Sequence, residues 1–368
     1  MRKKLIDEIS KRLKISQHEL LEKDIILHEI MTDLSKSDYF VKNYVFKGGT
    51  CLTKCYLGYY RFSEDMDFTW KNQKMFERKT TSQLRRDLSE IISKTGQIVE
   101  EIASKRGLDF KCKKSDREYV ELGGSNKRCT FKIWYISEIT KNKTFVKFQI
   151  NYVEKLCFPF KSGKLSSLVK IDVKELSLLF SEHREYFETI DFDIYDQNEI
   201  LCEKVRAILT RQATKARDYL DVYKVCEKFG LDMTNLEKEI MLKLESALEM
   251  NERYKEFIKQ KAIDIESGNL FEWGDEQDLL LEKIDDEKFY SFNKTFKKFL
   301  NKIIPDKYHS LMYKLPISAV CSGGDGANNI PHNVSIQNPG GISFDEIDLT
   351  KEKCPRCGLV GAMKAFPF

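Results

Sequence analysis

The stretch FKGGTCLTKCYLGYYRFSEDMDF, residues 46–68, joins a glycine turn to two carboxylates that are one residue apart. Gly48 and Gly49 lie in the turn, and Asp65 and Asp67 close the stretch. Paired glycines let backbone N–H groups approach phosphate oxygens closely. Aspartates at positions i and i+2 of a strand point to the same face, so both can hold one Mg²⁺. The stretch therefore predicts a phosphate cradle beside a magnesium site, the combination that nucleotide transfer requires.

The elements around the turn agree with this prediction. Residues 44–46 have the pattern of a short strand, and a helix is expected over residues 50–59. A phosphate at the N-terminus of that helix would gain from the helix dipole as well as from free N–H groups. Residues 61–70 have the pattern of a second strand, which carries the two aspartates on one face.

The rest of the chain divides into a mixed first part and a helical second part. Helices are expected at residues 1–40, 82–106, 199–215, 216–229, 235–262 and 275–301, and strands at 108–113, 117–122, 129–136 and 144–153. These patterns predict an α+β fold. We expect three domains: a core over residues 1–195, a helical domain over 196–315 and a small cysteine-containing appendage over 316–368.

Composition limits the kind of protein this can be. The chain has 368 residues, of which 41% are hydrophobic and 33% are charged, so a substantial core and a soluble surface are expected. It contains no run of eighteen apolar residues and no secretory signal, which favours a cytoplasmic protein with no membrane partner. In that compartment its ten cysteines are expected to be reduced thiols.

Charge is distributed unevenly along the chain. The net charge is only +4, but residues 101–175 hold 17 Lys and Arg against 9 Asp and Glu. A basic middle suits a polyanionic partner. The same excess is also compatible with an ordinary lysine-rich, solvated surface.

Three side chains near the turn are further candidates for contacts to a nucleotide. Lys47 directly precedes the glycines and could reach a phosphate as a point charge, or it could be solvated. Thr50 follows the glycines at the start of the expected helix. Ser63 shares the strand face of the aspartates, where its hydroxyl could bind phosphate or serve a structural role.

A second group of polar residues lies in EILCEKVRAILTRQATKARDYLDVYKV, residues 199–225. Asp218 and Asp221 are spaced i and i+3, so they share one helical face, and Lys204 lies on the preceding expected helix. An ordinary pair of salt-bridged helices would show the same pattern. Together with the first stretch, a functional role is favoured.

The two stretches resemble the AbiEii/AbiGii toxin family of nucleotidyltransferases, within the polymerase-β-like nucleotidyltransferase superfamily. The likeness rests on KGGTCLTKCYLGYYRFSEDMDF and on the later EKVRAIL and KARDYLDVY, and it covers roughly residues 18–230. It implies a mixed sheet flanked by helices. It also implies that Asp65 and Asp67 bind metal, that Lys204 and Asp218 complete the site, and that the triphosphate is held by Gly48, Gly49, Thr50 and Ser63.

One position departs from the superfamily pattern. Many members carry a third carboxylate on a later strand, and here Gln149 stands in the candidate strand FVKFQINYVEK. Glu154 or Asp218 could substitute for it, or a second metal could be bound mainly by substrate. The sequence therefore leaves open whether a second metal binds.

The C-terminal part offers a separate signal. Cys354-Pro355-Arg356-Cys357-Gly358 is typical of the turn in zinc knuckles, where two thiolates bind one metal. Cys321 and His332 are the nearest further ligands, which would give a Cys₃His site for a structural Zn²⁺. Free thiols are the alternative, because the spacing is irregular.

The expected function is Mg²⁺-dependent transfer of a nucleotide from a nucleoside triphosphate, GTP or CTP, to an RNA acceptor. The resemblance favours a tRNA 3′ end as acceptor, and the role of a toxin that is opposed by a cognate antitoxin in a toxin–antitoxin or phage-defence pair. Two alternatives stay open. One is transfer to a protein or small-molecule hydroxyl, and the other is a GTP-binding regulator with little catalysis.

Overall fold

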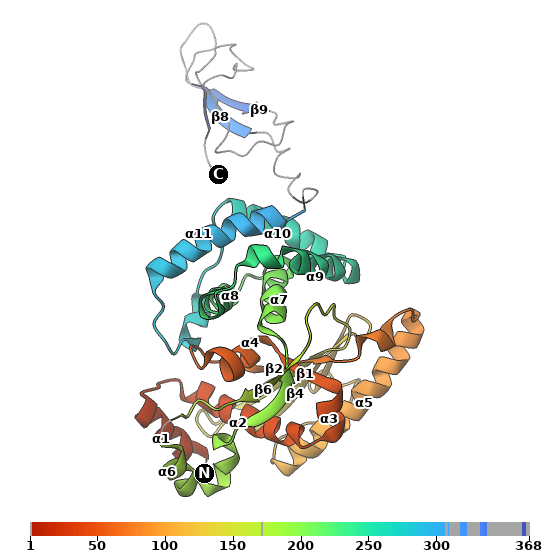
Figure 1. The fold of residues 1–368 in the computed structure, drawn as a ribbon, viewed down its shortest axis with the longest axis vertical. Coiled ribbons are helices and arrows are strands. Elements are labelled where there is room, and N and C mark those ends of the chain that lie inside the picture. The colour runs from red at the N-terminus through yellow and green to blue at the C-terminus, as the bar shows by residue number, and fades with distance from the viewer. Residues whose placement is uncertain are drawn as a thin grey trace. The chain divides into compact units, whose positions relative to one another are not determined.

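The computed structural model describes residues 2–170, 172–305 and 308, and the backbone of three short strands further on (Figure 1). Contacts divide the chain into two compact units. The first unit is Met1–Glu252 with Phe271–Thr295, and the second is Arg253–Leu270 with Phe296–Phe368. The three-domain division expected from the sequence stays a prediction.

A seven-stranded mixed sheet forms the centre of the first unit. Its order is β3-β4-β5-β2-β1-β7-β6. The β1–β7 and β2–β5 pairs are parallel and the other neighbours are antiparallel. The strands are β1 (Tyr44–Lys47), β2 (Asp65–Trp70), β3 (Val120–Gly123), β4 (Arg128–Ile136), β5 (Lys143–Asn151), β6 (Lys161–Leu165) and β7 (Ile190–Ile194).

Helices cover this sheet and fill the later part of the chain. They are α1 (Arg2–Leu13), α2 (His18–Ser35), α3 (Asp38–Asn43), α4 (Gly48–Cys51), α5 (Thr81–Lys105), α6 (Val173–Leu179), α7 (Gln197–Thr210), α8 (Ala216–Phe229), α9 (Glu237–Met250), α10 (Arg253–Glu266) and α11 (Asp286–Ile303). Short 3₁₀ segments lie at Gln73–Phe76, Ser181–Phe187, Met233–Leu236 and Gly274–Leu279, and a π-helical segment follows α4 at Leu52–Leu57. The mixed sheet with flanking helices confirms the α+β prediction.

One face of the sheet packs on helices and forms the aromatic core. Phe40 of α3 lies against Phe68 of β2 and Phe148 of β5, with ring centroids 4.9 and 5.8 Å apart. In Figure 1, α2, α3 and α5 lie on one side of the sheet, and α4 and α7 lie on the other. Because side chains alternate along a strand, the residues between the core positions point to the side of α4 and α7.

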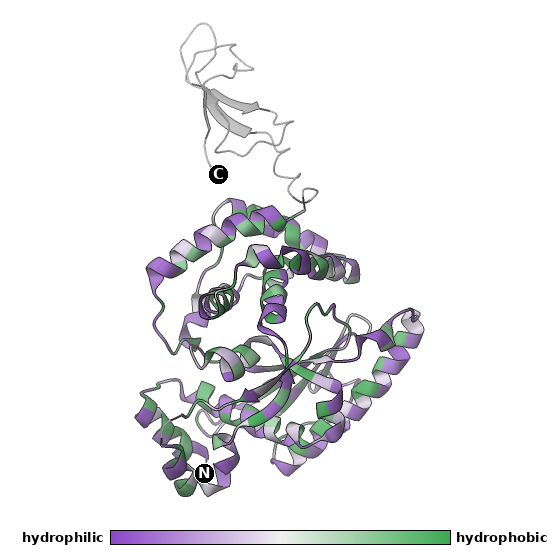
Figure 2. Ribbon diagram, in the orientation of Figure 1, coloured by the Kyte–Doolittle hydropathy of each residue, from purple (hydrophilic) through white to green (hydrophobic). Residues whose placement is uncertain are grey.

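The amphipathic pattern of the long helix α5 explains its position. Figure 2 shows hydrophobic and hydrophilic residues alternating along it. Its buried residues Leu84, Leu88 and Ile92 recur at helical spacing. A capping box begins the helix: Thr80 accepts a hydrogen bond from the Gln83 backbone, and the Gln83 side chain accepts one from the Thr80 backbone.

Several local predictions need correction. The helix expected over residues 235–262 is two helices, because Asn251 adopts extended dihedral angles (φ −149°, ψ 107°) and ends α9. Residues 108–113 form no strand and pair with the sheet through a single bridge from Asp109 to Trp134. The strands β6 and β7 were not predicted from the sequence.

In the second unit the described strands form a small antiparallel sheet of order β10-β8-β9. These strands are β8 (Ile317–Cys321), β9 (His332–Ile336) and β10 (Met363–Ala365). Among the residues that the structure describes, none of the helices combines the length and the apolar composition that spanning a membrane needs.

Candidate active site

The turn after β1 brings the backbone against a carboxylate. Gly48 has φ +79°, in the left-handed region that favours glycine. A Cβ at Gly48 would lie 2.4 Å from Asp67 Oδ2, and a Cβ at Gly49 would lie 2.5 Å from Arg61 Nη2. Glycine is therefore needed at both positions, because any side chain would displace Asp67 or Arg61.

The two aspartates lie on the sheet face that points away from the aromatic core. Asp67 of β2 pairs with Lys47 on β1 and with Gln149 on β5, and Asp65 pairs with Lys147. The intervening Met66 is fully buried, whereas both aspartates are partly exposed. The alternation of β2 thus places both carboxylates side by side, as the sequence predicted for that strand.

Neither carboxylate has a polar partner in the part of the chain that the structure describes. Among the described residues, no side chain or backbone group forms a hydrogen bond or an ion pair with the carboxylate oxygens of Asp65 or Asp67. Burial, the neighbouring Asp65 and the charge of Glu203 raise the pKa of Asp67 to about 6, although Lys47 and Lys204 act in the opposite direction. The pair is a local concentration of negative charge, which a bound cation would stabilise.

The hydroxyls of the turn are used to hold this arrangement. Thr50 is fully buried, and its Oγ1 lies 2.8 Å from Ser63 Oγ. The same oxygen also bonds to the backbone carbonyl of Asp65. Thr50 therefore fixes the start of β2 against the turn, and Ser63 completes this contact.

The second polar stretch forms a buried network of charges. Lys204 Nζ of α7 lies 2.8 Å from Asp218 Oδ1 and 2.5 Å from Asp221 Oδ2, both on α8. Arg211 also pairs with Asp218. Burial alone would raise the pKa of Asp218, but Lys204 and Arg211 outweigh it and hold this pKa well below its usual value. Asp218 is thus an ionised partner of Lys204.

Arg61 links this network to the glycine turn, and sequence reasoning gave it no role. Its Nε and Nη2 donate to the two carboxylate oxygens of Asp221 at 2.8 and 2.7 Å. Tyr60 donates to Asp221 Oδ1 at 2.6 Å. The side chains of Arg61 and Asp221 are both buried. A buried arginine is rare and requires a charged partner. The sequence feature that could have indicated a role for Arg61 is its position between the glycines and the aspartates.

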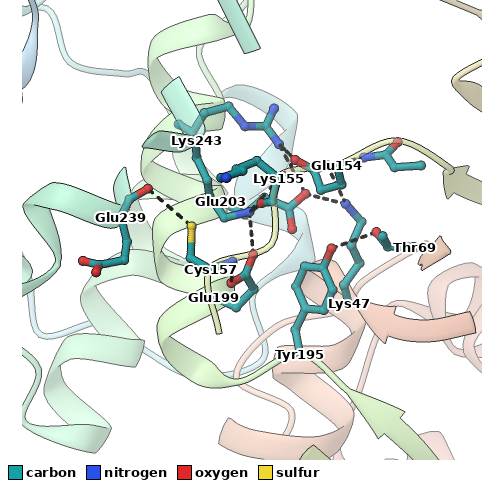
Figure 3. Close-up of polar contacts among 12 residues, drawn as sticks. Lys47, Thr69, Glu154, Lys155, Cys157, Tyr195, Glu199, Glu203, Glu239 and Lys243 are labelled. Carbon is teal, nitrogen blue, oxygen red and sulfur yellow. Dashed lines mark hydrogen bonds and ion pairs between the residues drawn. The ribbon is translucent and has the colours of Figure 1, made fainter. Parts of the chain in front are cut away.

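A further buried cluster surrounds Lys47, as Figure 3 shows. Lys47 Nζ lies 2.5 Å from Glu203 Oε1 and 3.6 Å from Glu154 Oε2. Lys243 of α9 pairs with Glu199 at 2.6 Å. The Lys47 side chain is only 4% exposed, so a phosphate would have to compete with Glu203 for its ammonium group.

Glu154 lies in this cluster with Lys47. Burial alone would raise the pKa of Glu154, but Lys47, Arg206 and Lys243 lower it to about 2. The sheet position opposite Asp67 belongs to Gln149. Within the described ranges, no group of three or more His, Cys, Asp or Glu side chains could hold a metal ion.

Two carboxylates still fit one magnesium ion. Mg²⁺ in phosphoryl-transfer sites is usually held by one or two carboxylates, with waters and substrate phosphates as the other ligands. The unpaired charges of Asp65 and Asp67 and the raised pKa of Asp67 suit two carboxylates that would share one divalent cation. The donor set is too small for a metal site made of protein ligands alone.

The zinc candidates cannot be placed as a group. Cys354 and Cys357 lie outside the described residues. The backbone of Cys321 in β8 pairs directly with that of His332 in β9. The zinc site stays a prediction.

One of the comparisons with known proteins identifies a family. The family model described as nucleotidyl transferase AbiEii toxin, type IV TA system, matches residues 29–315. No curated protein matches the chain. The crystal structure of JHP933 from Helicobacter pylori is 17% identical, covers 81% of this chain and 98% of its own, and has a TM-score of 0.36. A candidate nucleotidyltransferase from H. pylori is 16% identical, covers 80% and 97%, and has a TM-score of 0.34.

Proposed function

The chain belongs to the AbiEii family of nucleotidyltransferase toxins of type IV toxin–antitoxin systems, and from this premise we propose that it transfers a nucleotide to RNA with Mg²⁺. The donor is a nucleoside triphosphate, GTP or CTP, and the acceptor is a tRNA 3′ end. One observation carries the proposal. Asp65 and Asp67 lie unpaired on one strand face, beside a turn that only glycine can form.

In this proposal each residue has a separate task. Asp65 and Asp67 hold Mg²⁺, and the N–H groups of the glycine turn bind phosphate oxygens. When bound, Mg²⁺ neutralises charge on the triphosphate and lowers the pKa of the attacking hydroxyl. The hydroxyl oxygen forms a bond to the α-phosphorus, the bond from that phosphorus to the leaving oxygen breaks, pyrophosphate departs and the hydroxyl proton passes to water.

Lys204 is the cation that we assign to the phosphates of the bound triphosphate. It is 12% exposed, and Asp218 and Asp221 hold its ammonium group from one side. Because Asp218 is kept ionised by Lys204 and Arg211, its role is to orient Lys204 rather than to carry a proton. Ser63 and Thr50 keep the aspartate strand against the turn.

The biological role follows from the family. A nucleotide added to the acceptor end of tRNA would block aminoacylation and stop translation, which is a toxic outcome for the cell. A cognate antitoxin would restrain this activity. The family match supports an antitoxin partner, and the acceptor is our proposal.

A labelling experiment tests the proposal. Purified protein is incubated with each α-³²P-labelled nucleoside triphosphate, Mg²⁺ and total tRNA. Label on tRNA is expected, and it should disappear with EDTA and in Asp65→Asn. Asp286→Asn, an exposed change in the first turn of α11, serves as the matched control. Label on protein or on a small molecule, or retention of unreacted nucleotide without transfer, would overturn the RNA assignment.

A further inference from the structure

The sheet face that carries Asp65 and Asp67 continues across β5 and β4, away from β1. Asp65 pairs with Lys147 of β5, and Lys147 pairs with Lys132 of β4. Two residues further along, Phe145 pairs with Trp134. From strand spacing and rise, the Cα atoms of Asp65 and Trp134 are roughly 12 Å apart.

Alternation along both strands separates a covered face from an open one. Phe131, Ile133 and Phe148 are buried, and they lie on the side of α3 and α5. The residues between them are partly or fully exposed. These open-face residues are Arg128, Thr130, Lys132, Trp134, Ile136, Lys143, Phe145, Lys147, Gln149 and Asn151.

The open face of β4 and β5 is cationic. Arg128, Lys132, Lys143 and Lys147 belong to it, and neither strand contains an acidic residue. Rim acids neutralise two of these charges: Glu121 pairs with Lys132, and Glu118 and Asp109 pair with Lys143 at 2.8 and 3.4 Å. In the described part of the chain, Lys147 and Arg128 have no ion pair.

Two aromatic rings lie among these cations. The ring centroids of Trp134 and Phe145 are 4.6 Å apart, and the indole Nε1 donates to the Glu118 carbonyl at 2.9 Å. This hydrogen bond fixes the ring on the open face. Lys143 Nζ lies 4.8 Å from the indole centroid. The Lys143 side chain is 44% exposed. A base that stacked on the indole would displace the Lys143 side chain toward a neighbouring phosphate.

We propose that this open face, defined by Trp134, Phe145, Lys132, Lys143, Lys147 and Arg128, binds the single-stranded end of the RNA acceptor. Aromatic rings between cations are the usual platform for unpaired bases, which stack while their phosphates meet the charges. The face is continuous with Asp65, so a strand bound there would lead its terminal hydroxyl to the carboxylate pair. The inference rests on the proposed function for its acceptor, but binding tests it separately from transfer.

The test uses the full chain and a 5′-fluorescein-labelled 12-nucleotide single-stranded RNA of mixed sequence. Anisotropy should show binding that Trp134→Ala and Phe145→Ala each weaken by about 5- to 100-fold. Lys147→Ala should weaken binding and reduce the slope of log K against log salt by about one unit. Tyr290→Ala, an aromatic that is 75% exposed on α11, and Lys174→Ala on α6 are the matched controls with unchanged binding.

Tryptophan fluorescence gives a readout that a merely unstable variant would not reproduce. The chain has three tryptophans, and Trp70 is buried. RNA should quench the emission of the wild-type chain, and Trp134→Phe should lose most of this quenching while it keeps affinity within a few-fold. Circular dichroism checks that each variant is folded.

The outcomes separate the two proposals. If RNA binding depends on Trp134 and Phe145 but no nucleotide is ever transferred, the open face is an RNA-binding site and the proposed function is wrong. If transfer to tRNA occurs and the Trp134 and Phe145 variants bind RNA as well as the controls do, the open face is not the RNA-binding site. Equal or tighter binding of duplex RNA, or of an acidic peptide of the same charge, would also overturn the proposal.

Discussion

At the scale of single residues, Asp65 and Asp67 differ from the acids of the other charged clusters because those acids form ion pairs. Asp218, Asp221, Glu154 and Glu203 are all held by lysine or arginine. The two aspartates of β2 have no such partner in the described residues. Their mutual repulsion is a cost in the folded protein, and a divalent cation would remove it.

Burial of Asp67 and this repulsion together predict how stability depends on pH without metal. The pKa of Asp67 is raised from its ordinary 3.8 to about 6 in the folded state, so the folded protein binds its proton more tightly than the unfolded chain does. The stabilising contribution is complete below about pH 4 and is lost as pH rises through 6. Its size is at most roughly 3 kcal/mol, because one pKa unit corresponds to about 1.4 kcal/mol.

Asp67→Asn should therefore abolish transfer and, in EDTA, raise the melting temperature at pH 8 relative to the wild type. At pH 4 the two proteins should differ little. Thermal unfolding monitored by circular dichroism between pH 4 and 8 measures this, with Asp286→Asn as control. Parallel curves for Asp67→Asn and the wild type over the whole range would show that the carboxylate is not destabilised.

At the scale of elements, the glycine turn has two separable requirements. Gly48 needs a positive φ, and it also needs the space that Asp67 occupies. Gly107, after α5, has φ +67° but nothing within 4 Å of the Cβ position. A Gly→Ala change at Gly48 or Gly107 should lower the free energy of unfolding by about 1–2 kcal/mol, because a residue with a Cβ disfavours a left-handed backbone.

Gly48→Ala should lose about 100-fold in transfer, because displacing a reacting group by 1 Å has an effect of that order. Gly107→Ala should lose similar stability and keep activity. Steady-state transfer rates and chemical unfolding on the same preparations distinguish the two effects. Equal activity of the two variants would mean that the Asp67 carboxylate is not constrained by the turn.

The Arg61–Asp221 pair joins α8 to the segment before β2. Removing one member of a buried ion pair typically costs about 3–5 kcal/mol, because the other charge is left without a partner. We expect such a loss in urea unfolding of Asp221→Asn. Glu175→Gln, at an exposed pair with Arg12, should change stability by about 1 kcal/mol or less. A similar small loss at Asp221 would exclude a structural role for the pair.

The sequence predicted the first strand, the glycine turn and the second strand because local rules govern them: glycine dihedral freedom and the alternation of a strand. The second strand begins at Asp65 and not at residue 61 as expected. Helical spacing predicted that Asp218 and Asp221 share one helical face, and the family resemblance grouped Lys204 with Asp218. The sequence did not predict that Lys47 would be buried against Glu203 and Glu154. The contact between Lys47 and Glu203 joins β1 to α7 across 156 positions. The short strands β6 and β7 were missed since their stability comes from sheet neighbours rather than from their own residues.

At the scale of the whole molecule, the described active-site residues all belong to the first unit, whereas the cysteine-rich end belongs to the second. The candidate zinc ligands and the carboxylate pair therefore share no residue. The pairing of Cys321 with His332 brings two of the four candidate ligands to neighbouring strand positions. Paired Cα atoms of antiparallel strands are about 4.5–5.5 Å apart.

Elemental analysis of the full chain should find about one zinc per chain, and Cys354→Ser and Cys357→Ser should each remove most of it. Cys226→Ser, a buried free cysteine of α8, is the control that keeps its zinc. Transfer activity should survive the loss, since the proposed Mg²⁺ site needs none of these ligands. Zinc-free wild-type protein would establish that the three candidate cysteines are free thiols.

Helix α7 places two consecutive residues in different networks. Glu203 holds Lys47 at the end of β1, and Lys204 holds Asp218 and Asp221 of α8. A mutation that lengthened or shortened this helix by one residue would rotate both contacts away together. In related proteins, insertions should consequently accumulate in the loops on either side of α7, and exchanges at Glu203 should be accompanied by exchanges at Lys47.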